Sequence, residues 1–187
     1  IISRVDKPTQ WVNNLVIIEK PNKELRLCLD PRDLNKAVMR EIHKIPTPET
    51  IITNLVGNEV FSVFDMSHGF WQIRLTEESS DYCTFNTPFG RYKFNRLPFG
   101  LSSAPEVFQK KNEEIFGDIP GVHIYFDDII VSGKNVSDHD NNLKLFLDRA
   151  REQNVKLNSD KIQFKVHEVR YCGQIISKNS TRMDDKY

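Results

Sequence analysis

The chain has 187 residues, of which 39% are hydrophobic and 28% are charged, and its 26 basic residues balance its 26 acidic residues. This size and composition are typical of a soluble globular protein with one domain, or with one domain and a small subdomain. The sequence has neither the basic excess of a general nucleic-acid binder nor an apolar run long enough to span a membrane, although a local basic groove is compatible with it.

The first sixty residues predict a hairpin and a helix. Residues 15–20 and 25–30 are apolar runs on either side of a polar tip, which predicts a β-hairpin. Thr47 followed by Pro48 is typical of a helix start, and Gly57 is typical of a helix end.

The middle of the chain predicts strands. Residues 60–66 form an apolar run that contains Asp65, and residues 84–87 and 91–94 flank a turn to form a second hairpin. Between them, Trp71, Ile73 and Leu75 alternate with polar residues, which predicts a half-buried strand.

The second half predicts two helices and further strands. Ser103-Ala104-Pro105-Glu106 forms a capping box, so a helix should run from there to about residue 117. A hairpin over residues 122–131 follows, then an amphipathic helix over 138–154 with His139 in its first turn, and strands over 163–166 and 169–176. Hairpins and helices without regular βαβ alternation predict an α+β fold with a largely antiparallel sheet.

The cysteines and the chain ends indicate the context. Cys28, Cys83 and Cys172 are far apart and form no zinc motif, so we expect small core residues in a reducing, intracellular compartment. No signal peptide precedes the first strand, and we expect no membrane partner. Because the chain begins with Ile1 and ends in the polar residues 184–187, we expect a fragment of a longer polypeptide.

Two adjacent carboxylates, Asp127 and Asp128, interrupt the apolar run V-H-I-Y-F-D-D-I-I-V at residues 122–131. Buried charges are costly unless they are paired or bound to metal, so this position calls for a reason. At the bend of a hairpin, the two side chains can converge on a divalent cation such as Mg²⁺. The alternative is a surface hairpin in which both residues are ordinary turn formers.

Asp65 closes a second apolar strand. If the two strands are neighbours, three carboxylates meet without a His or Cys nearby, which favours a pair of Mg²⁺ ions over zinc. Two such ions, about 3.5–4 Å apart, clamp the attacking and leaving oxygens in phosphoryl transfer. One lowers the pKa of the attacking hydroxyl and the other neutralises charge on the leaving phosphate.

Four segments, in order, resemble the reverse transcriptase domain of animal gypsy-type long-terminal-repeat retrotransposon polyproteins. They are L-R-L-C-L-D-P-R-D-L-N at 25–35, F-D-M-S-H-G-F-W-Q-I at 64–73, L-P-F-G-L-S-S-A-P at 97–105 and Y-F-D-D at 125–128. The resemblance covers residues 11 to about 176.

The resemblance implies the α+β fold of a right-hand polymerase, with a mostly antiparallel palm sheet backed by helices. It places the fingers at about 1–58 and 76–102, interleaved with the palm at about 59–75 and 103–187. Thumb, connection and ribonuclease H regions are absent from this sequence.

For the catalytic centre, the resemblance implies that Asp65, Asp127 and Asp128 form the metal-binding triad and that the backbone carbonyl of Met66 also faces a metal. Phe70 would stack beneath the incoming sugar, where a bulky ring leaves no volume for a 2′-hydroxyl. The alternative for Phe70 is an ordinary core residue.

For the nucleotide, the resemblance implies that Lys20 and Arg26 reach the triphosphate. Both residue types bind phosphate, Lys as a compact point charge and Arg through its planar guanidinium. Solvated charges at a strand edge are the alternative for both residues. Phe99 and Gly100 would line the nucleotide pocket, and Lys161 is a candidate proton donor to pyrophosphate.

For the primer and template, the resemblance implies contacts from Pro98, from Tyr125 and Phe126, and from the primer grip that contains Cys172 and Gly173. The primer grip would be Tyr171-Cys172-Gly173-Gln174, and relatives usually carry Leu and His where Cys172 and Gln174 stand. Recognition should follow backbone and shape, because a polymerase must accept any sequence.

The implied function is RNA-directed DNA synthesis, in which a primer 3′-hydroxyl attacks the α-phosphate of a deoxynucleoside triphosphate and releases pyrophosphate. It requires two Mg²⁺ ions, or Mn²⁺ in their place, a primed RNA or DNA template, and the remaining polyprotein segments (thumb, connection and ribonuclease H). Three alternatives stay open: an inactive, decayed or domesticated palm that only binds nucleic acid, a structural fragment that needs the missing thumb, and an RNA-templated RNA polymerase, against which Phe70 argues.

Two departures from the family pattern suit a drifting or decaying copy. Asn112 stands on the helix after Pro105 where relatives have an apolar residue, and a buried unpaired amide there would cost roughly 1–3 kcal/mol. The segment 177–182 lacks an expected glycine.

Overall fold

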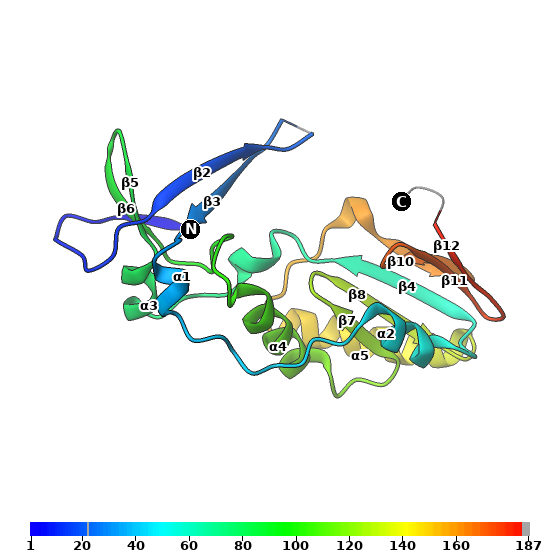
Figure 1. The fold of residues 1–187 in the computed structure, drawn as a ribbon. Coiled ribbons are helices and arrows are strands. Elements are labelled where there is room, and N and C mark those ends of the chain that lie inside the picture. Colours follow the sequence, from blue (N-terminus) through cyan, green and yellow to red (C-terminus); the bar gives the residue numbers. More distant parts are fainter. Residues whose placement is uncertain (22, 185–187) are drawn as a thin grey trace. The chain divides into compact units, whose positions relative to one another are not determined.

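The computed structural model describes residues 1–21 and 23–184 (Figure 1). Asn22, in the tip of the first predicted hairpin, and residues 185–187, in the polar end segment, lie outside the described residues.

The chain divides into two compact units, which we describe separately. Unit 1 comprises Ile1–Ile42 and His68–Phe108, and unit 2 comprises His43–Ser67 and Gln109–Tyr187. Compared with the boundaries expected from the sequence, this division groups residues 43–58 with unit 2 and residues 68–75 and 103–108 with unit 1. The names fingers and palm stay predictions.

Unit 1 is built from two antiparallel sheets and short helices. β1 (Ile2–Arg4), β6 (Gly90–Phe94) and β5 (Thr84–Thr87) form one sheet, and β2 (Asn14–Glu19) pairs with β3 (Leu25–Asp30) in a two-stranded ribbon. Both hairpins predicted in this part of the chain are therefore confirmed. The helices are α1 (Leu34–Ala37), α3 (Glu77–Tyr82) and a 3₁₀-helix (Gly69–Gln72). The core gathers around Leu29, Cys83, Phe85 and Phe94.

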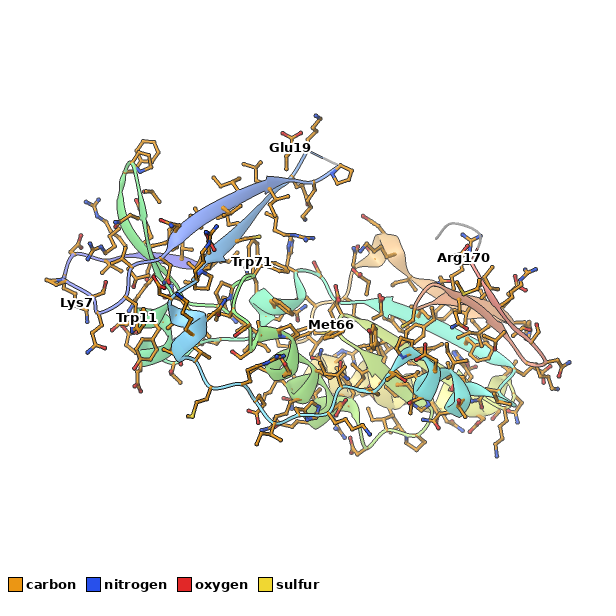
Figure 2. All side chains as sticks on the ribbon, in the orientation of Figure 1. Lys7, Trp11, Glu19, Met66, Trp71 and Arg170 are labelled. Atoms are coloured by element: carbon orange, nitrogen blue, oxygen red, sulfur yellow. The ribbon has the colours of Figure 1, made fainter. Side chains whose placement is uncertain are left out.

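The strand predicted from the alternation of Trp71, Ile73 and Leu75 is wrong. His68 has a left-handed backbone conformation (φ 52°), and the N–H of Trp71 donates to its carbonyl at 2.8 Å. The N–H of Ile73 donates to the carbonyl of Phe70 at 3.1 Å, so the segment coils into a 3₁₀-helix. Figure 2 labels Trp71 in this turn. A short alternating pattern cannot reveal a left-handed residue that turns the chain immediately before it.

Unit 2 is centred on a four-stranded antiparallel sheet with the order β7-β8-β4-β9. The strands are β7 (Val122–Tyr125), β8 (Asp128–Gly133), β4 (Val60–Asp65) and β9 (Gln163–Val166). α5 (Val136–Glu152) packs on β8 and β4, and the rings of Phe64 and Phe146 lie 5.0 Å apart. His139 is in the first turn of α5, as predicted, and its Nε2 lies 3.0 Å from the hydroxyl of Ser62.

The opposite face of this sheet carries a second apolar cluster. Phe61, Val63 and Ile130 point to it and pack with buried residues of α2 (Pro48–Leu55), which begins at its cap Thr47 as predicted. The side chains of Val169 and Ile176 complete the cluster. Because side chains alternate along a strand, the sheet is apolar on both faces.

The strand predicted at residues 169–176 is in fact a hairpin. β10 (Glu168–Tyr171) and β11 (Gln174–Ser177) pair antiparallel, and β12 (Thr181–Met183) pairs with β11. Cys172 (φ 49°) and Gly173 (φ 74°) form its two-residue loop. Two successive positive φ angles match the turn that joins tightly paired strands, but Cys is not a residue that signals it.

α4 (Ala104–Phe116) begins and ends as predicted, and the boundary between the two units falls within it. In the described part of the chain, no helix has both the length and the apolar character to cross a membrane.

Ile130→Ala should lower the free energy of unfolding by about 2–5 kcal/mol, because it leaves a cavity at a fully buried position of β8. Leu145→Ala removes a similar apolar group from the exposed side of α5, and it should change the stability by less than about 0.5 kcal/mol. Urea denaturation followed by circular dichroism measures both, and equal losses would contradict the placement of Ile130 in the core.

Candidate active site

The three predicted carboxylates lie at one end of the central sheet of unit 2. Asp65 ends β4 and pairs directly with Asp128, which begins β8. Asp128 also pairs with Tyr125, so Phe126 and Asp127 form the two-residue loop of the β7–β8 hairpin. Directly opposed residues of antiparallel strands have Cβ atoms roughly 4.5–5.5 Å apart. The sequence could not show that the two strands are neighbours, and the register shows that they are.

The end of β4 is tied to this loop through its backbone. The N–H of Met66 donates to the carbonyl of Asp127 at 2.8 Å, and Met66 itself is buried. On its other side, Met66 pairs with Leu157. Figure 2 labels Met66 at this end of β4.

Lys161 and Asn158 bind the carboxylate of Asp65. The Lys161 ammonium lies 2.9 Å from Oδ2 of Asp65, and the Asn158 amide donates to Oδ1 at 3.3 Å. The backbone N–H of Asn158 also donates to the carbonyl of Asp65 at 2.8 Å. The Lys161 side chain is 63% exposed whereas that of Asp65 is 13% exposed, so the ammonium reaches in from solvent. Its hydrogen bond to Asp65 raises the pKa of Lys161.

Asp128 carries the clearest electrostatic signature of the site. Burial, followed by the negative charges of Asp127 and Asp65, raises the pKa of Asp128 to about 6, and Lys161 opposes this rise. Burial and the two neighbouring carboxylates all disfavour the ionised form of Asp128. A bound cation would relieve the same repulsion.

The donor set fits a divalent cation by its chemistry, because carboxylate oxygens are the ligands that Mg²⁺ prefers. Asp65, Asp127 and Asp128 would hold it, together with the carbonyl of Met66. Within residues 1–21 and 23–184, no three His, Cys, Asp or Glu side chains already converge as a ready-made metal cluster. In this arrangement the Lys161 ammonium lies against Asp65 instead.

The loop of the β10–β11 hairpin lies next to Asp128. The hydroxyl of Tyr171 donates to the backbone carbonyl of Asp128 at 3.2 Å. Burial, with a smaller effect from Asp128, raises the pKa of Cys172 to about 12, so its thiol stays neutral. The carbonyl of Gly173 accepts a hydrogen bond from the N–H of Asp184 at 3.0 Å. Cys172, one of the predicted primer-grip residues, therefore lies close enough to Asp128 to feel its charge, and Gly173 follows it in the loop.

Unit 1 brings together a second set of predicted residues. The ring of Phe70 lies 4.9 Å from that of Phe99 and 5.1 Å from that of Phe108. The Arg26 guanidinium lies over Phe99, 4.9 Å from the ring centre. Gly100 (φ 108°) follows, and a Cβ there would lie 1.9 Å from the carbonyl oxygen of Leu29, so only glycine fits.

Two predicted residues of unit 1 lie outside this aromatic group. Lys20 pairs with Glu24 at 2.9 Å at the base of the hairpin tip, and Pro98 is buried.

Sequence reasoning missed two buried amides of α4 that bind the carboxylate-bearing loop. Gln109 donates to the carbonyl of Ile124 at 3.0 Å and accepts from the N–H of Phe126 at 2.8 Å. Asn112, noted in the sequence as a departure from the family pattern, donates to the carbonyl of Phe126 at 3.0 Å, so its buried amide is paired and the cost of an unpaired one does not arise. The only signal was a polar residue on a helix face that otherwise packs inward. Asn158 was also missed, because nothing in its sequence context points to Asp65.

In the metal-free protein, Asp128→Asn should raise the melting temperature more at pH 7 than at pH 4. The pKa of Asp128 is about 6 in the folded chain and roughly 3.9 in an unfolded one. The folded chain therefore binds an extra proton between these values, and stability is lost as pH rises through this window. The substitution removes that loss.

Thermal unfolding in a chelating buffer across this pH range measures the effect. Asp148→Asn is the control, because a hydrogen bond from Lys144 lowers the pKa of Asp148 and its removal should bring no gain at high pH. A melting-temperature gain for Asp128→Asn that is independent of pH would contradict the raised pKa.

Comparisons with known proteins agree with this geometry. Residues 18–176 match the family model for reverse transcriptase (RNA-dependent DNA polymerase). The chain is 35% identical over 186 residues to the retrovirus-related Pol polyprotein from transposon 412 of Drosophila melanogaster, which covers 95% of this chain and 15% of that protein. It is 32% identical over 166 residues to the corresponding polyprotein from transposon gypsy of the same fly, with 88% of this chain and 16% of that protein covered.

Among solved structures, the foamy viral protease-reverse transcriptase in complex with double-stranded DNA superimposes with a TM-score of 0.90 at 25% identity, covering 99% of this chain and 32% of that one. A complex of the foamy viral enzyme with an RNA/DNA hybrid gives a TM-score of 0.88, covering 100% of this chain and 25% of that one. The chain spans between 14% and 25% of the length of the polyproteins and related proteins it matches. It belongs to the reverse transcriptase family of RNA-dependent DNA polymerases, and its relatives include gypsy-type retrotransposon Pol polyproteins.

Proposed function

We propose that this chain carries the nucleotidyl-transfer centre of a retrotransposon reverse transcriptase, which extends a primer with deoxynucleotides on an RNA or DNA template. The observation that carries the proposal is the register of the central sheet. It sets Asp65 directly opposite Asp128 and places Asp127 in the adjoining two-residue loop. Membership of the reverse transcriptase family indicates the class of reaction, and the three carboxylates are its proposed site.

In unit 2, the proposed roles follow from chemistry. Asp65, Asp127 and Asp128, with the carbonyl of Met66, hold two divalent cations, Mg²⁺ or Mn²⁺. When bound, such ions lower the pKa of an attacking hydroxyl and neutralise charge on a leaving phosphate. Lys161 would then lose its partner Asp65, and its largely exposed ammonium would be available to donate a proton to pyrophosphate.

In unit 1, the aromatic group provides the proposed support for a deoxynucleotide. Phe70 packs against Phe99, so its ring is fixed rather than free to swing away from a 2′-hydroxyl. Arg26 is held over Phe99, where its guanidinium can bind phosphate oxygens, and Lys20 would add a second positive charge if its ion pair with Glu24 opened. The missing Cβ of Gly100 lets its backbone pack against the carbonyl of Leu29, next to Phe99 in the proposed pocket.

The proposed partners are a primed RNA or DNA template, deoxynucleoside triphosphates and the other segments of a Pol polyprotein. Tyr125, Phe126 and Pro98 are the proposed contacts to template and primer, and Cys172 and Gly173 are the proposed primer grip. The solved relatives are complexes with double-stranded DNA and with an RNA/DNA hybrid, which supports this choice of partner. The departure at Asn112 no longer favours a decayed copy, because its amide is paired.

Asp127→Asn combined with Asp128→Asn should reduce primer extension by roughly 10³-fold or more, because it removes two of the three charges that bind the cations. The measurement is single-nucleotide incorporation on an RNA template with Mg²⁺, using the full-length protein that carries this chain. Asp148→Asn removes an exposed carboxylate of α5 and should leave the rate unchanged. A folded wild-type protein that binds primer–template but incorporates nothing would overturn the proposed activity.

Phe70→Val should lower the preference for deoxynucleotides over ribonucleotides by roughly 100-fold, because the smaller side chain leaves volume for the 2′-hydroxyl. Incorporation of each nucleotide type in competition gives the ratio. Phe89→Val is the matched control, since Phe89 is 83% exposed at a hairpin tip and its loss should leave the ratio unchanged. If Phe70→Val left the ratio of deoxynucleotide to ribonucleotide incorporation unchanged, Phe70 would not be the residue that excludes the 2′-hydroxyl.

A further inference from the structure

The loop that carries Asp127 has an unfavourable backbone. Phe126 adopts a positive φ of 53°, a left-handed conformation that residues with a Cβ avoid and that glycine usually supplies in a two-residue hairpin loop. The conformation persists only if its surroundings hold it. Phe126 immediately precedes Asp127, so any relaxation of its backbone would move the Asp127 carboxylate.

Two side chains of α4 hold this residue. Gln109 accepts from the N–H of Phe126 at 2.8 Å, and Asn112 donates to its carbonyl at 3.0 Å. The two amides are three positions apart, which places them on the same face of the helix. Gln109 is 0% exposed and Asn112 is 2% exposed, so both amides are shielded from water on the helix side of their hydrogen bonds to the half-buried Phe126.

The bond from Asn112 has a particular consequence for Asp127. The carbonyl of Phe126 belongs to the peptide group that enters Asp127, and Asn112 holds that group. The carbonyl of Asp127 belongs to the peptide group that leaves it, and the N–H of Met66 holds that one at 2.8 Å. Both peptide planes around Asp127 are thus fixed, one by α4 and one by the end of β4.

We infer that Asn112 is a positioning residue, whose amide fixes the peptide plane before Asp127 and thereby sets where this carboxylate presents its oxygens to a divalent cation. The inference rests on the proposed function of the three carboxylates. Asn112 itself touches neither cation nor substrate in this role. It acts through the backbone of Phe126.

Burial alone does not distinguish this role from ordinary structural support, but unit 2 offers a matched comparison. Asn142 of α5 is 7% exposed and donates to the carbonyl of Ser132 at 2.9 Å. Like Asn112, it is a buried helix amide bound to the β7–β8 hairpin, but its partner lies at the opposite end of β8 from Asp128. Asn142→Leu therefore removes an equivalent hydrogen bond without affecting the loop.

The test compares Asn112→Leu with Asn142→Leu in the full-length protein that carries this chain. Asn112→Leu should lower kcat by about tenfold or more, because small misplacements of a reacting group are costly, and should raise the Mg²⁺ concentration for half-maximal rate. The KM for the nucleotide should change little. Asn142→Leu should keep the wild-type kcat and Mg²⁺ dependence even where its melting temperature falls.

A rescue variant makes the mechanism specific. Glycine adopts positive φ without strain, so Phe126→Gly added to Asn112→Leu should restore the wild-type Mg²⁺ dependence, whatever the rate loss from removing the template or primer contact proposed for the Phe126 side chain. If Asn112→Leu does not fold, Asn112→Ala removes the amide without added apolar volume and takes its place. Equal kinetic effects of the Asn112 and Asn142 substitutions, or an unchanged Mg²⁺ dependence in the Asn112 variant, would overturn the inference.

Mn²⁺ binding, followed by electron paramagnetic resonance, separates this inference from the proposed function. If the wild-type protein incorporates no nucleotide, the proposed activity fails, yet weaker Mn²⁺ binding in Asn112→Leu than in Asn142→Leu still supports positioning by Asn112. Equal Mn²⁺ binding in the two variants overturns it. A wild-type protein that binds no Mn²⁺ overturns both.

Discussion

The pairing of β4 with β8 is the constraint on which the rest of unit 2 depends. Along these strands, Phe61, Val63 and Ile130 point to one face and Phe64 and Ile129 point to the other, and both faces are buried. Because side chains alternate with a period of two, a slip of one residue would exchange the faces and disrupt both apolar clusters at once. The same register that satisfies the core therefore sets Asp65 opposite Asp128. Hydrophobic packing, distributed over the whole sheet, fixes the geometry of three charges at its end.

Those charges are unfavourable for the isolated fold, and the surrounding structure limits their cost. Lys161 and Asn158 bind the carboxylate of Asp65, and the tight hairpin loop leaves Asp127 at the surface, where water reaches it. The ionised form of Asp128 stays unfavourable, because burial and the charges of Asp127 and Asp65 raise its pKa. The repulsion that the surrounding structure does not relieve is therefore concentrated at Asp128.

Much of this arrangement could be predicted from the sequence, and the exceptions have physical reasons. The hairpins were predicted from apolar runs separated by polar tips, because burial of strands in a sheet leaves a hydrophobic pattern in the sequence. The 3₁₀-helix after His68 and the turn at Cys172 were missed, because each depends on positive φ angles in residues that do not signal them. The chemistry of the three carboxylates made them stand out in the sequence, but only the structure shows that they lie together at one end of the sheet. Asn112 was read as an anomaly, because its partner is a backbone carbonyl, which carries no sequence signature.

The contact between Lys161 and Asp65 bears on the order in which the site is assembled. Many small metal-binding domains gain their folding energy from the ion, so chelation unfolds them. In this chain the ammonium of Lys161 already pairs with Asp65 at the end of β4, and apolar packing on both faces of the sheet holds the strands together. If the carboxylates bind cations as proposed, folding would not depend on cation binding, and an arriving ion would displace the Lys161 ammonium from Asp65.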